Sequence, residues 1–148
     1  MNITQHEMLA LAISNAAMAH ANQFDKAGLP YILHCLKVMY LLKSDDPELM
    51  AIAVLHDIVE DTKTTYTDLY DMGMSRRVVD GVRALTKQRG QTTTDYLEQV
   101  KNNPDAIKVK LADLRHNSDI RRLKGITDDD VKRMRKYHAM YTELKDLV

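Results

Sequence analysis

Apolar residues recur at helical spacing along most of this chain, and most of these runs begin at a residue that caps helices. Thr4 followed by Glu7 has the capping-box pattern ahead of the run MLALAISNAAMAHA. Pro30 and Pro47 each stand at the start of a further apolar run, where proline favours the first helical turn. Paired runs with strand-like alternation are absent from the sequence. The pattern therefore predicts an all-α protein.

The same signals divide the chain into seven or eight helices joined by short connections. The expected helices cover residues 8–21, 31–43, 47–61, 67–72, 76–87, 94–102 and 105–122, with a last one that starts after Thr127. We find no internal repeat and no linker rich in Pro, Gly or Ser. We therefore expect one compact helical bundle and a single domain over residues 1–148.

The amino-acid composition excludes some classes of protein and argues against others. Hydrophobic residues make up 45% of the 148 residues, which excludes a disordered chain. Lys plus Arg and Asp plus Glu both total 21, and this zero net charge argues against a dedicated nucleic-acid binder. No signal peptide or membrane-spanning run is visible. We expect a cytoplasmic protein with no membrane partner.

The single cysteine, Cys35, excludes an internal disulfide and suits a reducing compartment. Its apolar surroundings favour a small buried side chain. A zinc thiolate and a nucleophile are the alternatives.

Four ionisable residues interrupt the apolar stretch VLHDIVED at residues 54–61. They are His56, Asp57, Glu60 and Asp61. Residues three or four apart share a helix face, so this quartet forms one compact polar surface. Burying such groups is unfavourable unless they share a partner.

His34 and Asp113 are also flanked by apolar residues, in YILHCLKVM and VKLADLRHN. A divalent ion bound by His34, His56, Asp57 and Asp113 would supply the missing positive charge. Two imidazoles and two carboxylates suit manganese, iron or zinc better than calcium. Such an ion lowers the pKa of its bound water and neutralises phosphoryl charge.

Glu60 and Asp61 follow the His-Asp pair by one turn, where a carboxylate could exchange protons with an attacking water. Phosphate chemistry also needs cations, and Lys26 is the best placed because it precedes His34 in a loop. Other candidate cations are Lys108, Lys110, Arg121 and Arg122.

The order of these residues resembles the HD superfamily of metal-dependent phosphohydrolases, which is named after its His-Asp doublet. DKAGLPYILH, AVLHDIVEDTKTTYTDL and VKLADLRHN are similar to segments of the hydrolase domains of Rel/Spo-type alarmone enzymes and of the small Mesh-type alarmone hydrolases. The resemblance covers residues 8–141. It implies an HD-domain fold and removal of the 3′-pyrophosphate from guanosine tetraphosphate.

Carried over by position, the resemblance implies that His34, His56, Asp57 and Asp113 bind the metal, typically manganese. It implies that Glu60 and Asp61 activate the water, and that Lys26, Asn117 and Tyr137 contact the nucleotide. An amphipathic-helix aromatic is the alternative for Tyr137.

In one place the chain departs from these relatives, since Asp25 stands where they usually carry a basic residue. Asp25 would repel a phosphate unless a cation such as Arg121 pairs with it. Another 3′-phosphorylated or pyrophosphorylated nucleotide, including a nicotinamide dinucleotide phosphate, stays open as substrate. Further alternatives are a 5′-nucleotidase and a catalytically silent nucleotide-binding domain.

Overall fold

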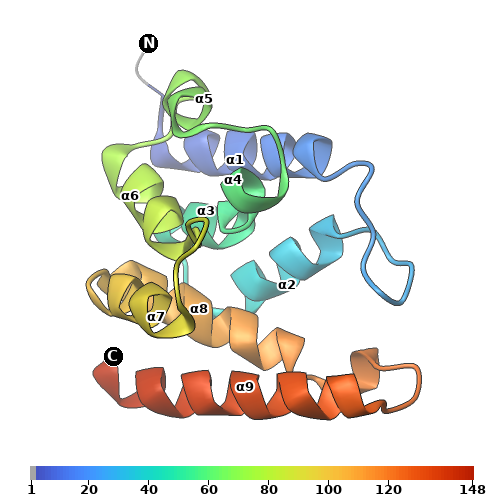
Figure 1. Ribbon diagram of the computed structural model, residues 1–148. Helices are drawn as coiled ribbons and strands as arrows, with labels where there is room; N and C mark the ends of the chain where they lie inside the picture. Colours follow the sequence, from blue (N-terminus) through green and yellow to red (C-terminus); the bar gives the residue numbers. More distant parts are fainter. Residues whose placement is uncertain (1–2) are drawn as a thin grey trace.

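Helices account for nearly all regular structure in residues 3–148, which are the residues described by this computed structural model (Figure 1). The α-helices are α1 (Gln5–Ala19), α2 (Ile32–Leu41), α3 (Pro47–Leu55), α4 (Ile58–Asp61), α5 (Tyr66–Asp71), α6 (Arg76–Leu85), α7 (Thr93–Lys101), α8 (Pro104–Asn117) and α9 (Asp128–Leu144). Two 3₁₀ helices, η1 (Ile120–Arg122) and η2 (Lys145–Leu147), follow α8 and α9. Within these residues there is no β-strand, so the all-α prediction is confirmed. The predicted domain span of 1–148 begins with residues 1–2, which lie outside the described part.

Several helices begin at the capping residues that the sequence indicated, whereas α2 follows Pro30 and Tyr31 without a side-chain cap. The Thr4 hydroxyl accepts a hydrogen bond from the Glu7 N–H at 3.0 Å, and Asp46 caps α3 with Pro47 in the first turn. Thr127 and Asp130 form a complete capping box at the start of α9. These side chains satisfy N–H groups that have no partner inside the helix.

Two of the expected helices are interrupted or end several residues before the predicted end. The helix expected over 47–61 is interrupted at His56 and Asp57, so that α3 and α4 are separate elements. The helix expected over 105–122 ends at Asn117, because the Ser118 side chain hydrogen-bonds the Leu114 carbonyl and η1 follows. The first interruption raises the number of α-helices to nine in residues 3–148.

The apolar helix α3 lies at the centre of the bundle. Its residues 51–55 are completely buried, and α1, α2, α6 and α8 all pack against it. Figure 1 shows α3 between α1 and α8, with α9 covering the far side of α8. The elements that carry the polar residues of interest therefore meet at the core of the protein.

None of the helices in residues 3–148 combines the length and the apolar character that crossing a membrane requires. Cys35 is fully buried, and burial raises the pKa of its thiol far above the ordinary range. Its predicted role as a small core side chain is confirmed.

Candidate active site

The two histidines and the aspartate of the predicted metal site converge on one point. Ligand atoms of His34 in α2 and of His56 and Asp57 between α3 and α4 lie within 4.8 Å of one another. From α8, Asp113 brings its Oδ1 to 3.0 Å from His34 Nε2 and 3.4 Å from His56 Nε2. The structure thus brings together four residues that span eighty positions of the sequence.

The state of His56 fits a bound cation. Its Nδ1–H donates to the Ala53 carbonyl at 2.7 Å, which leaves a lone pair on Nε2. This Nε2 is buried and makes no hydrogen bond within residues 3–148, although Asp57 Oδ2 lies only 3.0 Å away. The lone pair of His56 Nε2 and the negative Asp57 Oδ2 repel each other unless a cation lies between the two atoms. A divalent metal ion would be such a cation.

The same carboxylates act on the protonation of His56. Burial lowers the pKa of His56, but the charges of Asp57 and Asp113 outweigh burial and hold this pKa well above its ordinary value. Without an ion, a proton on His56 would therefore balance the carboxylates. Protons and a metal ion compete for this site.

The carboxylates are held in place by neighbouring donors. The Tyr31 hydroxyl donates to Asp57 Oδ2, and Asn117 Nδ2 donates to Asp113 Oδ1 at 3.0 Å. Lys110 donates to the other oxygen of Asp113 at 3.0 Å. Lys110, a candidate for binding phosphate by sequence, is thus engaged with a candidate metal ligand instead.

His116 also belongs to the site, although the sequence analysis did not single it out. Its ring stacks on His34 with centroids 5.0 Å apart, and the two Nδ1 atoms are 2.7 Å apart. Burial and then the Arg122 charge lower the pKa of His116 to about 4. A neutral His116 can accept the Nδ1–H of His34, which leaves His34 Nε2 free for a metal. The sequence contains one indication of this role, because His116 follows Asp113 by three residues and so shares its helix face.

Glu60 and Asp61 lie at the rim of the site on α4. Desolvation and then the charge of Asp57 raise the pKa of Asp61. Desolvation raises the pKa of Glu60 too, although Glu60 accepts a 2.7 Å hydrogen bond from the Lys87 N–H. Both carboxylates are therefore shifted toward a range in which they can take up and release protons.

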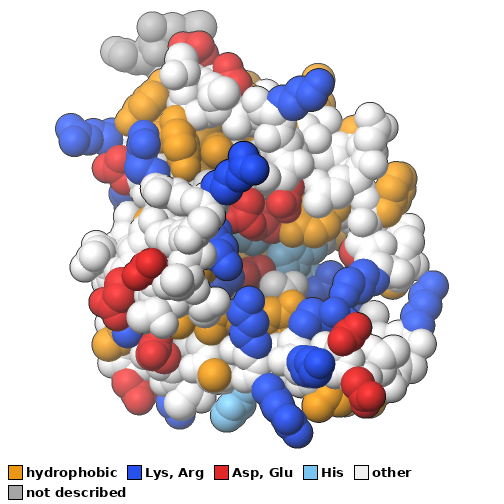
Figure 2. Space-filling model, in the orientation of Figure 1, with side chains coloured by type: hydrophobic (Ala, Val, Ile, Leu, Met, Phe, Trp, Pro, Cys, Tyr) orange, Lys and Arg blue, Asp and Glu red, His pale blue; other side chains and the backbone are white. Residues whose placement is uncertain are grey.

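The three residues expected to contact a nucleotide line one cavity of about 270 Å³. Lys26 comes from the α1–α2 loop, Asn117 from the end of α8 and Tyr137 from α9. Tyr31 also lines this cavity and connects it to Asp57. Figure 2 shows histidine side chains at the bottom of a hollow, with acidic side chains above them and several Lys and Arg side chains below and beside them.

Asp25, the residue that departs from the family pattern, is engaged within its own loop. Its Oδ1 accepts hydrogen bonds from the Ala27 and Leu29 N–H groups, both at 2.9 Å, and its Oδ2 lies 3.5 Å from Arg122 Nη2. Desolvation raises the pKa of Asp25, but these hydrogen bonds and the Arg122 charge outweigh it and lower the pKa. The cation that compensates Asp25 is thus Arg122, whereas Arg121 pairs with Asp119 at 2.6 Å.

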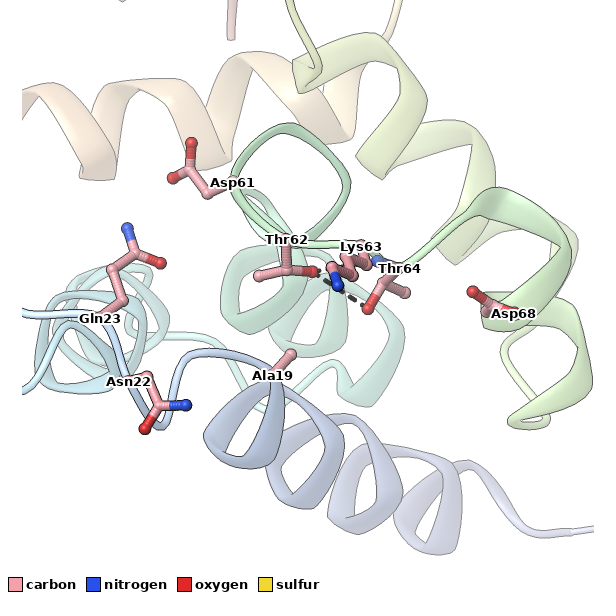
Figure 3. A pocket seen from close by; sticks show the side chains of 8 residues that line it. All are labelled: Ala19, Asn22, Gln23, Asp61, Thr62, Lys63, Thr64 and Asp68. Atoms are coloured by element: carbon pink, nitrogen blue, oxygen red, sulfur yellow. Dashed lines mark hydrogen bonds between the residues drawn. The ribbon is translucent and has the colours of Figure 1, made fainter.

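A second hollow, of about 630 Å³, opens on the other side of Asp61 (Figure 3). It is lined by Ala19, Asn22, Gln23, Asp61, Thr62, Lys63, Thr64 and Asp68. Gln23 borders both hollows, and its Oε1 accepts a 2.7 Å hydrogen bond from the buried His20. In Figure 3 the amide nitrogen of Gln23 is on the side that faces Asp61. His20, which the sequence analysis did not single out, therefore orients a side chain next to the catalytic candidates.

Comparisons with known proteins identify several relatives of this chain. The guanosine-3′,5′-bis(diphosphate) 3′-pyrophosphohydrolase MESH1 of Danio rerio is 34% identical over 132 residues, which cover 79% of this chain and 71% of that protein. The bifunctional (p)ppGpp synthase/hydrolase SpoT of Escherichia coli is 32% identical over an alignment of 170 positions, which covers 97% of this chain and 24% of SpoT. No model of a protein family matches the chain.

Several relatives are much longer than this chain. A guanosine-3′,5′-bis(diphosphate) 3′-pyrophosphohydrolase of Haemophilus influenzae is 33% identical over 132 residues, and the match covers 80% of this chain but only 19% of that protein. The chain therefore spans about a fifth of the length of such relatives.

The fold also matches a solved structure, that of a metazoan ortholog of SpoT, with a TM-score of 0.76 and 23% sequence identity. The match covers 99% of this chain and 87% of the solved chain. This structural match shows the shared fold, and the identity to MESH1 over 71% of that protein establishes that the chain belongs to the family of HD-type guanosine-3′,5′-bis(diphosphate) 3′-pyrophosphohydrolases.

Proposed function

We propose that this chain is a metal-dependent phosphohydrolase that removes the 3′-diphosphate from a guanosine nucleotide phosphorylated at both its 3′ and 5′ positions. The observation that carries this proposal is the buried, unpartnered Nε2 of His56 at the meeting point of His34, Asp57 and Asp113. We infer the substrate from the relatives, which are named guanosine-3′,5′-bis(diphosphate) 3′-pyrophosphohydrolases.

We further propose that His34, His56, Asp57 and Asp113 hold a Mn²⁺ ion. When bound, such an ion lowers the pKa of a water ligand and neutralises charge on the phosphate. The mixed nitrogen and oxygen ligands support a first-row transition metal, and the hydrogen bonds on His56 Nδ1 and Asp113 Oδ1 support a preformed site.

In this mechanism, Glu60 and Asp61 accept the proton of the attacking water and return one to the 3′-oxygen when its bond to phosphorus breaks. The raised pKa values of both carboxylates suit this exchange. Gln23, held by His20, orients the Asp61 carboxylate.

Lys26, Asn117 and Tyr137 bind the remainder of the nucleotide in their common cavity. Lys26 contributes positive charge, Asn117 hydrogen bonds, and Tyr137 an aromatic face. We also propose that residues 1–148 act as one hydrolase domain and that the protein works in the cytoplasm, where its nucleotide substrate and its free thiol would both fit.

The test is hydrolysis of guanosine 3′,5′-bis(diphosphate) by protein stripped of metal and then reconstituted with Mn²⁺. We expect release of pyrophosphate and GDP, and a loss of at least about a thousandfold in rate for Asp57→Asn, since ligand loss removes the metal-dependent step. Circular dichroism checks that the variant stays folded.

The same hydrolysis assay with NADPH and with nucleoside 5′-monophosphates tests the alternative substrates. Turnover of one of these without turnover of the guanosine nucleotide would refute the substrate. Stoichiometric metal with no hydrolysis of any nucleotide would refute the enzymatic proposal and indicate a binding domain.

A further inference from the structure

An exposed aromatic ring lines the cavity that we assign to the nucleotide. Phe24, the only phenylalanine of the chain, is 60% exposed and lies outside the hydrophobic core. Single exposed apolar side chains are common on protein surfaces, so exposure alone implies no function. What distinguishes Phe24 is the way in which its loop holds it beside the candidate metal site.

The α1–α2 loop fixes the backbone around Phe24. Phe24 and Pro30 form an antiparallel bridge, which is flanked by two backbone hydrogen bonds of 2.9 Å. One of these bonds joins the Tyr31 N–H to the Gln23 carbonyl. Tyr31 in turn donates its hydroxyl to the candidate ligand Asp57. The backbone that carries the exposed ring is therefore connected to the metal site through hydrogen bonds.

Asp25 closes the same loop. Its Oδ1 accepts hydrogen bonds from the Ala27 and Leu29 N–H groups, a turn that an aspartate side chain can stabilise and a basic side chain cannot. The departure of this chain from its relatives at position 25 therefore affects the conformation of the loop that presents Phe24.

The cavity beside Phe24 has an apolar and aromatic part that suits a flat base. Its wall also contains Leu123, and Met134 and Tyr137 of α9. Two neighbouring cavities around the loop, of about 320 and 380 Å³, are lined by Lys124 and two arginines each, and by no Phe or Tyr side chain of residues 3–148. Those cationic cavities suit phosphate groups, whereas a base is stabilised most beside an aromatic ring.

Resting on the proposed function, we infer that the base of the nucleotide stacks on the ring of Phe24 while its 3′-diphosphate lies at the metal site. Phe24 is then a specificity-determining residue, because it distinguishes a nucleotide from a sugar phosphate of the same charge. A stacking contact remote from the breaking bond is equally strong in the ground state and in the transition state. It therefore lowers KM and leaves kcat unchanged.

Phe24→Leu tests this inference, because leucine keeps an apolar side chain but has no ring. Calorimetry on metal-free protein measures the affinity for guanosine 3′,5′-bis(diphosphate) and for the same ribose bis(diphosphate) without a base. We expect Phe24→Leu to weaken binding of the guanosine nucleotide about tenfold, in the lower part of the range for base stacking on an aromatic side chain. Binding of the compound without a base should not change. In the Mn²⁺-loaded protein, KM for the guanosine nucleotide should rise by the same factor at constant kcat.

Tyr40→Leu is the matched control. Tyr40 is a 76% exposed aromatic residue of α2 and lines none of the three cavities around the loop. The change removes an exposed ring in the same way and should alter neither affinity. Phe24→Tyr keeps the ring and should retain the affinity for the guanosine nucleotide.

A fluorescent variant reports on the same contact directly. The chain contains no tryptophan, so Phe24→Trp introduces a single indole at this position. We expect the guanosine nucleotide to quench the indole fluorescence and the compound without a base to leave it unchanged. This second variant keeps the test decisive if Phe24→Leu fails to fold.

An equal loss of affinity for both compounds in Phe24→Leu, or a loss for neither, would overturn the inference. Indole fluorescence that responds equally to both compounds would overturn it as well. Absence of hydrolysis by the wild-type protein would refute the proposed function, while the affinities of the metal-free protein would still decide whether the base stacks on Phe24.

Discussion

Tyr31 shows how much of this site depends on single side chains outside the candidate ligand set. Its hydroxyl donates to Asp57, while its ring lies between those of His20 and His34, at centroid distances of 5.2 and 5.4 Å. The hydroxyl therefore fixes the orientation of one candidate ligand, and the ring contributes packing that does not require the hydroxyl.

Tyr31→Phe separates these two roles, because phenylalanine keeps the ring. We expect the affinity for Mn²⁺ to decrease about tenfold, the usual effect of removing a neighbour that orients a ligand. Competition with a fluorescent chelator measures this affinity. Tyr40→Phe, which changes an exposed tyrosine in α2, the helix that follows Tyr31, should have no effect. Equal affinities for wild type and Tyr31→Phe would contradict an orienting role.

The sequence was sufficient to find the candidate ligands but not the residues that orient them. His56, Asp57 and Asp113 attract attention because charged residues interrupt apolar runs. Tyr31 and His116 do not, since an aromatic ring or a single imidazole can pack almost anywhere. Their partners lie 26 and 82 residues away, so only the folded chain shows them.

At the scale of elements, the contact between α3 and α6 depends on a glycine. A Cβ atom at Gly81 would lie 2.5 Å from Ile52 Cδ1 and 2.8 Å from its Cγ1. Ile52 is fully buried and has little room to move. The two helices approach this closely because position 81 has no side chain.

We predict that Gly81→Ala destabilises the protein by about 1–3 kcal/mol, because overpacking outweighs the better helix propensity of alanine. Urea denaturation measures the free energy of unfolding. In an Ile52→Ala background the clash is removed, so the same change should stabilise by up to about 1 kcal/mol. Equal effects in both backgrounds would show that the close contact is not responsible.

Arg77 connects the first turns of two other helices to α6. Its guanidinium lies 2.8 Å from carboxylate oxygens of Asp46, the cap of α3, and of Asp105 in the first turn of α8, and 3.1 Å from Glu48. Desolvation raises the pKa of Asp46, but hydrogen bonds from Arg77 and from the backbone outweigh it and lower the pKa.

A lowered carboxyl pKa means that the stabilisation is present above the unfolded pKa of about 3.9 and is lost as the pH falls through the folded pKa. We predict that Arg77→Gln lowers the free energy of unfolding by about 1 kcal/mol at neutral pH, since solvent screens this partly exposed group. The difference should shrink below about pH 4. Arg76→Gln, at an arginine that is 88% exposed, should change little at either pH. A difference independent of pH would point to lost packing instead.

Helix starts were predictable from sequence because caps are local, whereas the interruption at His56 and Asp57 was not. The segment from Ala51 to Val59 has an apolar pattern suited to a continuous helix. Asp57 nevertheless adopts a φ of −103° and a ψ of 0°, and its carboxylate accepts a hydrogen bond from the Tyr31 hydroxyl. This contact joins segments that lie far apart in the chain. Tertiary contacts determine where this helix is interrupted, and the local sequence pattern carries no information about such contacts.

For the whole molecule, the candidate metal site joins α2, the α3–α4 junction and α8 at the centre of the bundle. The carboxylates of Asp57 and Asp113 both lie beside His34 and His56 there, so their charge must be balanced either by a bound metal ion or by a proton on His56. An ion bound to the folded chain but not to the unfolded chain must also stabilise the fold.

We therefore predict that Mn²⁺ at about one hundred times its Kd stabilises the protein by about 2.7 kcal/mol, which raises Tm by about 5–10 °C. Thermal unfolding followed by circular dichroism, with and without a chelator, measures this shift. Asp57→Asn preserves the shape of the side chain but removes a charged ligand, so it should lose most of the shift. Ca²⁺ should produce little stabilisation, because imidazole ligands disfavour it. If Asp57→Asn retained the full Mn²⁺-dependent shift, the ion would be bound elsewhere, and these three segments would owe their arrangement to packing alone.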